Sequence, residues 1–179
     1  MKIDYTYRDV PVSIFFSIVI IIIFLLYTTS LVKTIPCGDT ILQQFYSNFI
    51  HTDLYHILSN LYSIYALARV EKRIGIKKFL TLIIFLLVTN TIFETIAKKL
   101  KPELPCSIGF SGVLFGIMAW EIVSEKDLDP YILSAIGIMI AGPSIKNSDV
   151  SLLSHSIGAF SGIIGGLLYR YFQLLEKKN

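Results

Sequence analysis

The sequence of 179 residues is short of charge, because Asp, Glu, Lys and Arg together make up only 16% of it. About 25% is usual for a soluble globular protein. Hydrophobic residues make up 54%, the mean hydropathy is +0.65, and no low-complexity tract interrupts them. A chain of this composition cannot cover a soluble surface with polar side chains, which disfavours a soluble enzyme, a disordered regulator and a nucleic-acid binder. The length fits a single domain.

Long apolar runs are abundant. The first, Val12 to Val32, contains 21 residues and no charge, and about 20 such residues cross a bilayer. A cleaved signal peptide has a shorter apolar core, of about 7 to 15 residues, followed by a small-x-small cleavage site. The following Pro36-Cys37-Gly38 is not such a site. We therefore expect a membrane-spanning helix that stays attached to the protein.

Five further segments complete a predicted set of six spans. Phe79 to Ala97 and Val150 to Phe172 are clear, and Ile108 to Val123 is acceptable, whereas polar side chains weaken Leu54 to Val70. The poorest is Tyr131 to Ser144, because an apolar run of about 10 to 14 residues can also be re-entrant or interfacial. The sequence therefore predicts an all-α membrane protein, a bundle of six transmembrane helices joined by short loops.

The distribution of Lys and Arg predicts that both termini are cytoplasmic, because short cytoplasmic loops are enriched in basic residues. This orientation places 11 of the 16 basic residues inside, five of them between Arg69 and Lys78. A basic cluster at 98–101 on the outer side opposes it mildly. We expect a cytoplasmic N-terminus over residues 1–11, a six-helix domain over 12–172 and a cytoplasmic tail over 173–179. The identity of the membrane stays open.

Polar side chains within the spans are candidates for function, because a charged group in a membrane helix costs about 2.5 to 3.5 kcal/mol on insertion scales. His56 and Asn60 lie on the second span, Ser111 on the fourth and His155 on the sixth. All three spans start on the outer side, and each residue lies within about two helical turns of that start. The four residues are therefore expected to share one depth in the membrane.

Ser111 and His155 form a candidate catalytic pair. A serine hydroxyl needs a general base to become a nucleophile, and imidazole titrates near neutral pH. Small residues follow at every fourth position of the sixth span, from Ser154 to Gly166, and Gly112 and Gly116 form a similar stripe on the fourth. If the stripes face each other, the His155 Nε2 and Ser111 Oγ atoms can approach to about 2.6–3.2 Å. For an isolated Gly-x-Ser-Gly, helix packing alone is the alternative explanation.

His56 and Asn60 are four residues apart and share one face of a helix. Their N–H groups, with the backbone N–H of Ser111, suit the oxyanion that develops during acyl transfer; a polar pair that only bridges helices is the alternative. A zinc site at His51 and His56 is disfavoured, because no Cys or carboxylate falls into ligand register. Neither Asp39 nor Asp149 is tied to His155, so we predict a dyad.

Taken together, these segments resemble the rhomboid family of intramembrane serine proteases. The resemblance rests on His51-Thr-Asp-Leu-Tyr-His56-Ile-Leu-Ser-Asn60, Val70-Glu71-Lys72-Arg73-Ile74-Gly75, Gly109-Phe110-Ser111-Gly112 and His155-x-x-Gly158-x-x-x-Gly162. Order, spacing and placement on the spans agree over residues 12 to 172.

The resemblance implies a six-helix core whose active site opens to the extracytoplasmic side and takes transmembrane protein substrates from the bilayer. Ser111 would be the nucleophile, His155 the base and later the acid, and His56 and Asn60 would form the oxyanion hole with the Ser111 backbone. Gly109 would let the substrate approach. His51 and Glu71 match structural positions, the loop at 142–151 and the fifth helix would act as cap and gate, and no metal or cofactor is implied.

Two departures from the family pattern stand out. The family often has Trp-Arg in the first outer loop, where this chain has Leu42-Gln43, so we expect that loop to be held differently. Phe115 replaces a tyrosine that often stacks on the catalytic histidine, which preserves a ring but loses a hydroxyl. Cys37 and Cys106 fall in two outer loops, and we expect free thiols rather than a disulfide, which would require an oxidising compartment.

Two other functions compete with proteolysis. A rhomboid-like pseudoprotease would bind client transmembrane helices as an adaptor without cleaving them, but such relatives typically lose the serine or the histidine. A small transporter or channel would place polar residues across the whole membrane, whereas here they stop at one depth. The sequence leaves open the natural substrate and the oligomeric state.

Overall fold

The computed structural model describes residues 6–31, 40–125 and 152–176. These residues form only α-helices and their connections, so the predicted all-α fold class is confirmed. The helices are α1 (Pro11–Thr28), α2 (Ile41–Ser47), α3 (Leu54–Ile74), α4 (Ile76–Leu100), α5 (Ser111–Glu125) and α7 (Leu152–Glu176).

Five of the predicted spans coincide with α1, α3, α4, α5 and α7. Among the described helices, α1, α4 and α7 are long and apolar enough to cross a membrane, so the chain is an integral, multi-pass membrane protein. The helix α3 has 21 residues but carries polar side chains, and α5 has only 15 residues. The predicted fifth span, Tyr131 to Ser144, lies outside the described residues, as does the predicted cap at 142–151.

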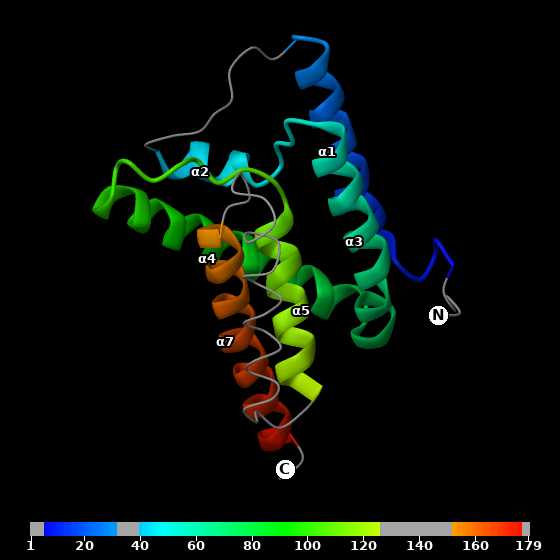
Figure 1. Cartoon of the computed structure of the whole chain (residues 1–179). Helices are drawn as coiled ribbons and strands as arrows, with labels where there is room; N and C mark the ends of the chain where they lie inside the picture. The colour runs from blue at the N-terminus through cyan, green and yellow to red at the C-terminus, as the bar shows by residue number, and fades with distance from the viewer. Residues whose placement is uncertain (1–5, 32–39, 126–151, 177–179) are drawn as a thin grey trace.

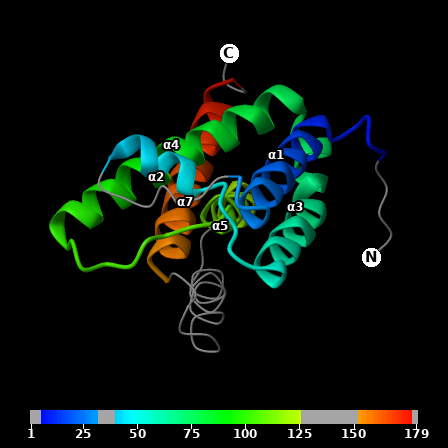
Figure 2. The same cartoon turned by 90° about the horizontal axis from the view of Figure 1, so that it is seen from above.

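The helix α5 lies at the centre of the molecule. Seen from above, α5 stands between the pair α1 and α3 on one side and α7 on the other (Figure 2). The helix α4 runs along a third side and crosses the direction of α5 at a large angle. Ten of the 15 residues of α5 are buried. Because neighbouring helices cover α5, its short length and moderate hydropathy are compatible with a position inside the bundle.

The small-residue stripes of α5 and α7 face each other, which is the condition that the sequence analysis set for the approach of Ser111 and His155. A Cβ atom added to Gly158 would lie 1.9 Å from the Gly112 carbonyl oxygen, and one added to Gly162 would lie 2.1 Å from the Gly116 carbonyl oxygen. No side chain fits at such distances, so glycine is required for the two backbones to touch. The two helices therefore stand side by side over their length (Figure 1).

The N-terminus of α1 is fixed by Glu71, which lies near the end of α3 and is fully buried. Its carboxylate accepts hydrogen bonds from the backbone N–H groups of Val12 and Ser13, both at 2.8 Å, and from the Ser13 hydroxyl at 2.7 Å. A carboxylate in this place satisfies amide groups that a helix start leaves without partners. Glu71 therefore has the structural position that the family resemblance implied.

The connection between α1 and α3 contains a short helix, α2, that the sequence analysis missed. Thr40 and Gln43 form a capping box at its start, with the Gln43 N–H donating to the Thr40 hydroxyl oxygen at 3.2 Å. One residue further on, the buried Gln44 side chain donates a hydrogen bond to Glu94 of α4. These polar contacts hold the loop where the family pattern has Trp-Arg.

Ion pairs also join α3 to α5. Glu121 of α5 pairs with Arg69 at 2.8 Å and with Arg73 at 3.1 Å, which joins α3 to α5 at the end opposite Ser111.

Cys106 is disulfide-bonded, so the expectation of a free thiol is wrong for this residue. Cys37 lies outside the described residues.

Candidate active site

The site is built at the ends of three helices. Ser111 is the first residue of α5, His155 is in the first turn of α7, and His56 is in the first turn of α3, with Asn60 one turn further along. These three helix starts lie at the same end of the molecule (Figure 1). The four polar residues that the sequence placed at one depth are therefore at one end of the bundle.

The Ser111 Oγ and His155 Nε2 atoms are 3.1 Å apart, within hydrogen-bonding distance. The close packing of α5 and α7 at Gly112 and Gly158 makes this approach feasible. Gly112 is the residue after Ser111, and Gly158 is three residues after His155. The Phe115 ring stacks on the His155 ring, with centroids 4.1 Å apart and an angle of 22° between the planes. Stacking and packing together orient the imidazole toward the serine.

Only Ser111 bonds to the His155 ring among the described residues. The Nδ1 atom of His155 is buried and has no hydrogen-bond partner there. A catalytic triad needs an acceptor at this atom, which fixes the tautomer of the ring. The described residues thus present a pair of groups, while Asp39 and Asp149 lie outside them.

Gly109 and His56 are in close contact. Gly109 has φ +100°, and a Cβ atom placed there would lie 2.5 Å from His56 Nε2. Positive φ and the absence of a side chain both favour glycine here. The His56 ring can therefore lie directly against the backbone that leads into Ser111.

Asn60 is buried on the same face of α3 as His56. Its Nδ2 atom donates to the His56 carbonyl oxygen at 2.8 Å, and its Oδ1 atom has no partner among the described residues. An amide nitrogen carries two N–H groups, and the second is not bonded to His56. The Asn60 side chain also lies against the His51 ring. The start of α3 is fixed by Asp53, whose carboxylate accepts the His56 backbone N–H at 2.8 Å.

His51 supports the loop that carries Gly109. Its Nε2 atom accepts the Phe110 backbone N–H at 3.5 Å, and its Nδ1 atom lies 3.3 Å from the Phe49 carbonyl oxygen. A carbonyl can only accept and an amide can only donate, so the ring must be neutral with its proton on Nδ1. Burial agrees with this, because it lowers the pKa of His51 to about 4. The role is structural, as the resemblance implied.

The sequence analysis attached no function to Glu94, although an acid within a span is unusual. Its carboxyl group is buried beside α7 and contacts Gln44 and Ser154. The placement of Glu94 inside the third predicted span was the available signal, since a buried intramembrane acid needs a polar partner.

Two comparisons relate the chain to known proteins. A family model described as the rhomboid domain matches residues 39–173. The chain is 27% identical over 122 residues to a protein of Acanthamoeba polyphaga mimivirus named "Putative rhomboid protein L523", and the match covers 68% of this chain and 71% of that relative. The matched domain includes all five site residues and most of the chain, so this protein belongs to the rhomboid family.

Proposed function

We propose that this protein is an intramembrane serine protease that cleaves peptide bonds in or near the transmembrane segments of membrane proteins. The observation that carries the proposal is the 3.1 Å contact between Ser111 Oγ and His155 Nε2 at the junction of α5 and α7. A serine at hydrogen-bonding distance from an imidazole is the arrangement that nucleophilic acyl transfer requires.

In the first step, His155 Nε2 takes the hydroxyl proton as Ser111 Oγ attacks the carbonyl carbon of the scissile bond. The bond between carbon and oxygen forms, and the carbonyl π electrons move to the oxygen, which becomes an oxyanion. The imidazolium of His155 then gives its proton to the leaving amine as the carbon–nitrogen bond breaks, which leaves an acyl group on Ser111.

The oxyanion needs donors that are already in place. We assign this role to the His56 ring, the second N–H of the Asn60 amide and the backbone N–H of Ser111. Ser111 is the first residue of α5. Its backbone N–H therefore has no acceptor within the helix, and it lies at the positive end of the helix dipole. Donors of this kind are worth about 2.7–4 kcal/mol each when one is removed.

The second step returns the enzyme to its starting state. His155 takes a proton from a water molecule, the hydroxide attacks the acyl carbon, and the bond to Ser111 Oγ breaks as the imidazolium returns its proton to that oxygen. Each proton moves among Ser111, His155, the substrate and water, so these steps need no metal or organic cofactor.

We further propose that both termini are cytoplasmic and that the site opens to the extracytoplasmic side. The excess of Lys and Arg on the predicted inner side supports this orientation. In this orientation the starts of α3, α5 and α7, where the site lies, are on the outer side. Substrates would then be transmembrane proteins that present a peptide bond near the outer surface of the bilayer.

The decisive test is the reaction of the purified protein in detergent with a serine-directed fluorophosphonate. We expect the wild type to be labelled and to cleave a reporter transmembrane segment that contains small, helix-breaking residues. Ser111→Ala and His155→Ala should abolish both reactions, because each removes one member of the pair. Ser124→Ala, at the far end of the same helix α5, is the matched control and should react like the wild type.

Two results would favour the adaptor function instead. One is a wild-type protein that is neither labelled nor active on varied reporters although it is folded. The other is cleavage that persists undiminished in Ser111→Ala, which would mean that another group or a contaminating enzyme performs the chemistry.

A further inference from the structure

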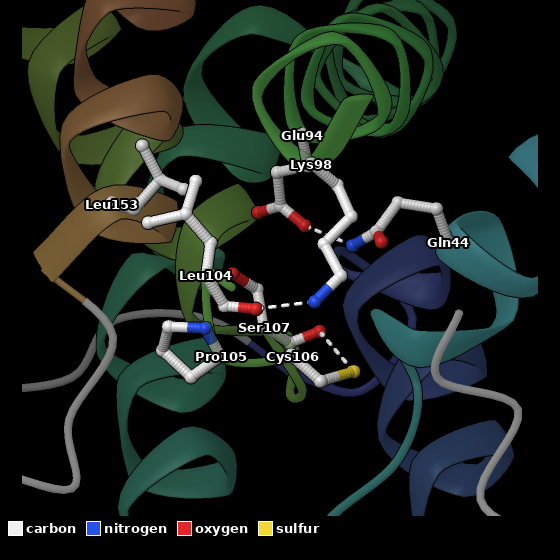
Figure 3. A pocket seen from close by; sticks show the side chains of 8 residues that line it. All are labelled: Gln44, Glu94, Lys98, Leu104, Pro105, Cys106, Ser107 and Leu153. Atoms are coloured by element: carbon white, nitrogen blue, oxygen red, sulfur yellow. Dashed lines mark hydrogen bonds between the residues drawn. The ribbon is translucent and has the colours of Figure 1, made fainter. Parts of the chain in front are cut away.

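Glu94 is a buried acid that the proposed chemistry does not use. It lies in the last two turns of α4, and its side chain is only 4% exposed. Figure 3 shows its carboxyl group between the Gln44 side chain of α2 and the start of α7 at Leu153. A charged or polar group buried in this way is costly unless partners compensate for the lost water.

The carboxyl group has partners on two other elements. Its Oε2 atom accepts a hydrogen bond from Gln44 Nε2, and the Ser154 side chain of α7 lies against the same carboxyl group. The Oε1 atom has no partner among the described residues, and Glu94 is one of the residues that line a pocket of about 80 Å³. One side chain of α4 therefore joins α2 to the first turn of α7.

Ser154 directly precedes His155, and it is confined on both sides. Its side chain is 3% exposed, and its Oγ lies 2.8 Å from the position that a Cβ atom on Gly112 would occupy. Ser154 thus fills the space between α4 and the residue that follows Ser111. A contact that holds the Ser154 side chain also limits rotation of the first turn of α7, which carries the His155 ring.

We propose that Glu94 is a positioning residue that sets the distance between His155 Nε2 and Ser111 Oγ by holding Ser154. This inference rests on the proposed function, because it assumes that the distance matters for proteolysis. Glu94 does not act on the substrate itself. It places the general base, and Gln44 in turn holds the Glu94 carboxyl group from the side of α2.

The proposal is tested with substitutions on both sides of the contact. Glu94→Leu removes the acceptor and Ser154→Ala removes the donor, whereas Glu94→Gln keeps a carbonyl oxygen that can accept from Ser154. We expect Glu94→Leu to lower the rate of fluorophosphonate labelling by about 10- to 100-fold, since a displacement of 1 Å near the reacting atoms can cost 10²-fold. Glu94→Gln should restore most of the rate.

Controls separate positioning from general destabilisation. Glu103→Gln changes an exposed glutamate in the loop after α4, and Ser156→Ala changes a serine two residues beyond Ser154; both should react like the wild type. With a reporter substrate, Glu94→Leu and Ser154→Ala should lower kcat and leave KM unchanged. The double variant should be no worse than the poorer single variant, because both changes break one interaction.

Hydrogen exchange of the backbone amides at 154–158 measures the same contact without any catalysis. We expect faster exchange there in Glu94→Leu and Ser154→Ala than in Glu94→Gln. If the wild type is not labelled, the proposed function fails, and the exchange data still decide whether Glu94 holds α7. Wild-type labelling rates in both Glu94→Leu and Ser154→Ala, or unchanged exchange at 154–158, would overturn the positioning role. If Glu94→Leu does not fold, Ser154→Ala alone gives the answer.

Discussion

Gly109 combines a backbone conformation that disfavours other residues with a contact that excludes a side chain. We predict that Gly109→Ala lowers fluorophosphonate labelling by about 10²-fold, because its Cβ would displace the His56 ring from the oxyanion site. Gly75→Ala is the matched control. Gly75 also has a positive φ, +86°, but nothing lies within 4 Å of the added atom.

Both substitutions carry backbone strain, of about 1–3 kcal/mol. Thermal unfolding in detergent should therefore show a lower midpoint for both variants, while labelling should fall only in Gly109→Ala. Equal labelling rates in the two variants would show that the contact between Gly109 and His56 is unimportant for the reaction.

The ring of Phe115 orients the imidazole of His155 by stacking. Phe115→Leu keeps an apolar side chain but removes the stacking energy, which is about 0.5–1.5 kcal/mol for aromatic pairs. We predict that kcat for a reporter substrate falls by about 2- to 12-fold, which is that energy expressed as a rate. Phe115→Tyr retains the ring and should keep the wild-type kcat. A Phe115→Leu enzyme with full activity would argue that helix packing alone positions His155.

The contact between α5 and α7 depends on glycine at Gly158. Alanine there would place a Cβ atom 1.9 Å from the Gly112 carbonyl oxygen, so the helices must move apart. We predict that Gly158→Ala lowers the free energy of unfolding by about 1–3 kcal/mol or more and abolishes most of the labelling of Ser111. The measurements are the thermal midpoint in detergent and the labelling rate.

Gly165 of the same helix is the control for this change. A Cβ atom there would meet only ring carbons, at 3.1 Å in Phe85 and 3.4 Å in Trp120, which can yield by small side-chain shifts. Gly165→Ala should therefore retain both stability and labelling. If Gly158→Ala behaves like Gly165→Ala, the close approach of the two backbones is not what brings Ser111 and His155 together.

Hydropathy detected the helices of this bundle unequally, for a physical reason. The exposed sides of α1 and α4 are apolar, so their spans were evident, whereas α5 is covered by its neighbours and needs no long apolar surface. The short helix α2 was missed because its seven residues are too few to show a repeating pattern of apolar and polar side chains. Its start signal, Thr40 followed three residues later by Gln43, is the pattern of a capping box and was readable.

The proposed orientation of the whole molecule rests on its charge distribution rather than on its packing. We predict that green fluorescent protein fused after residue 179 is fluorescent in cells, because it folds in the cytoplasm. Alkaline phosphatase fused after Lys101 should be active, because it requires the extracytoplasmic side. Inactive phosphatase at Lys101 together with a dark C-terminal fusion would reverse the proposed topology.

The sequence by itself determined the all-α membrane class, five helices close to their observed bounds and the candidates Ser111, His155, His56 and Asn60. It did so because hydropathy, charge and helical spacing are local properties that a linear pattern records. The glycine stripes on the two segments also indicated that α5 and α7 could touch, since only small residues allow two backbones to do so.

The tertiary structure alone decided which groups meet across helices. It brought Gln44, Glu94 and Ser154 together from three elements, placed Gly109 against His56, and paired Glu121 with Arg69 and Arg73. Such contacts depend on the rotation and tilt of each helix about its neighbours. Those angles arise from the sum of many side-chain contacts, and no single spacing along the chain encodes them.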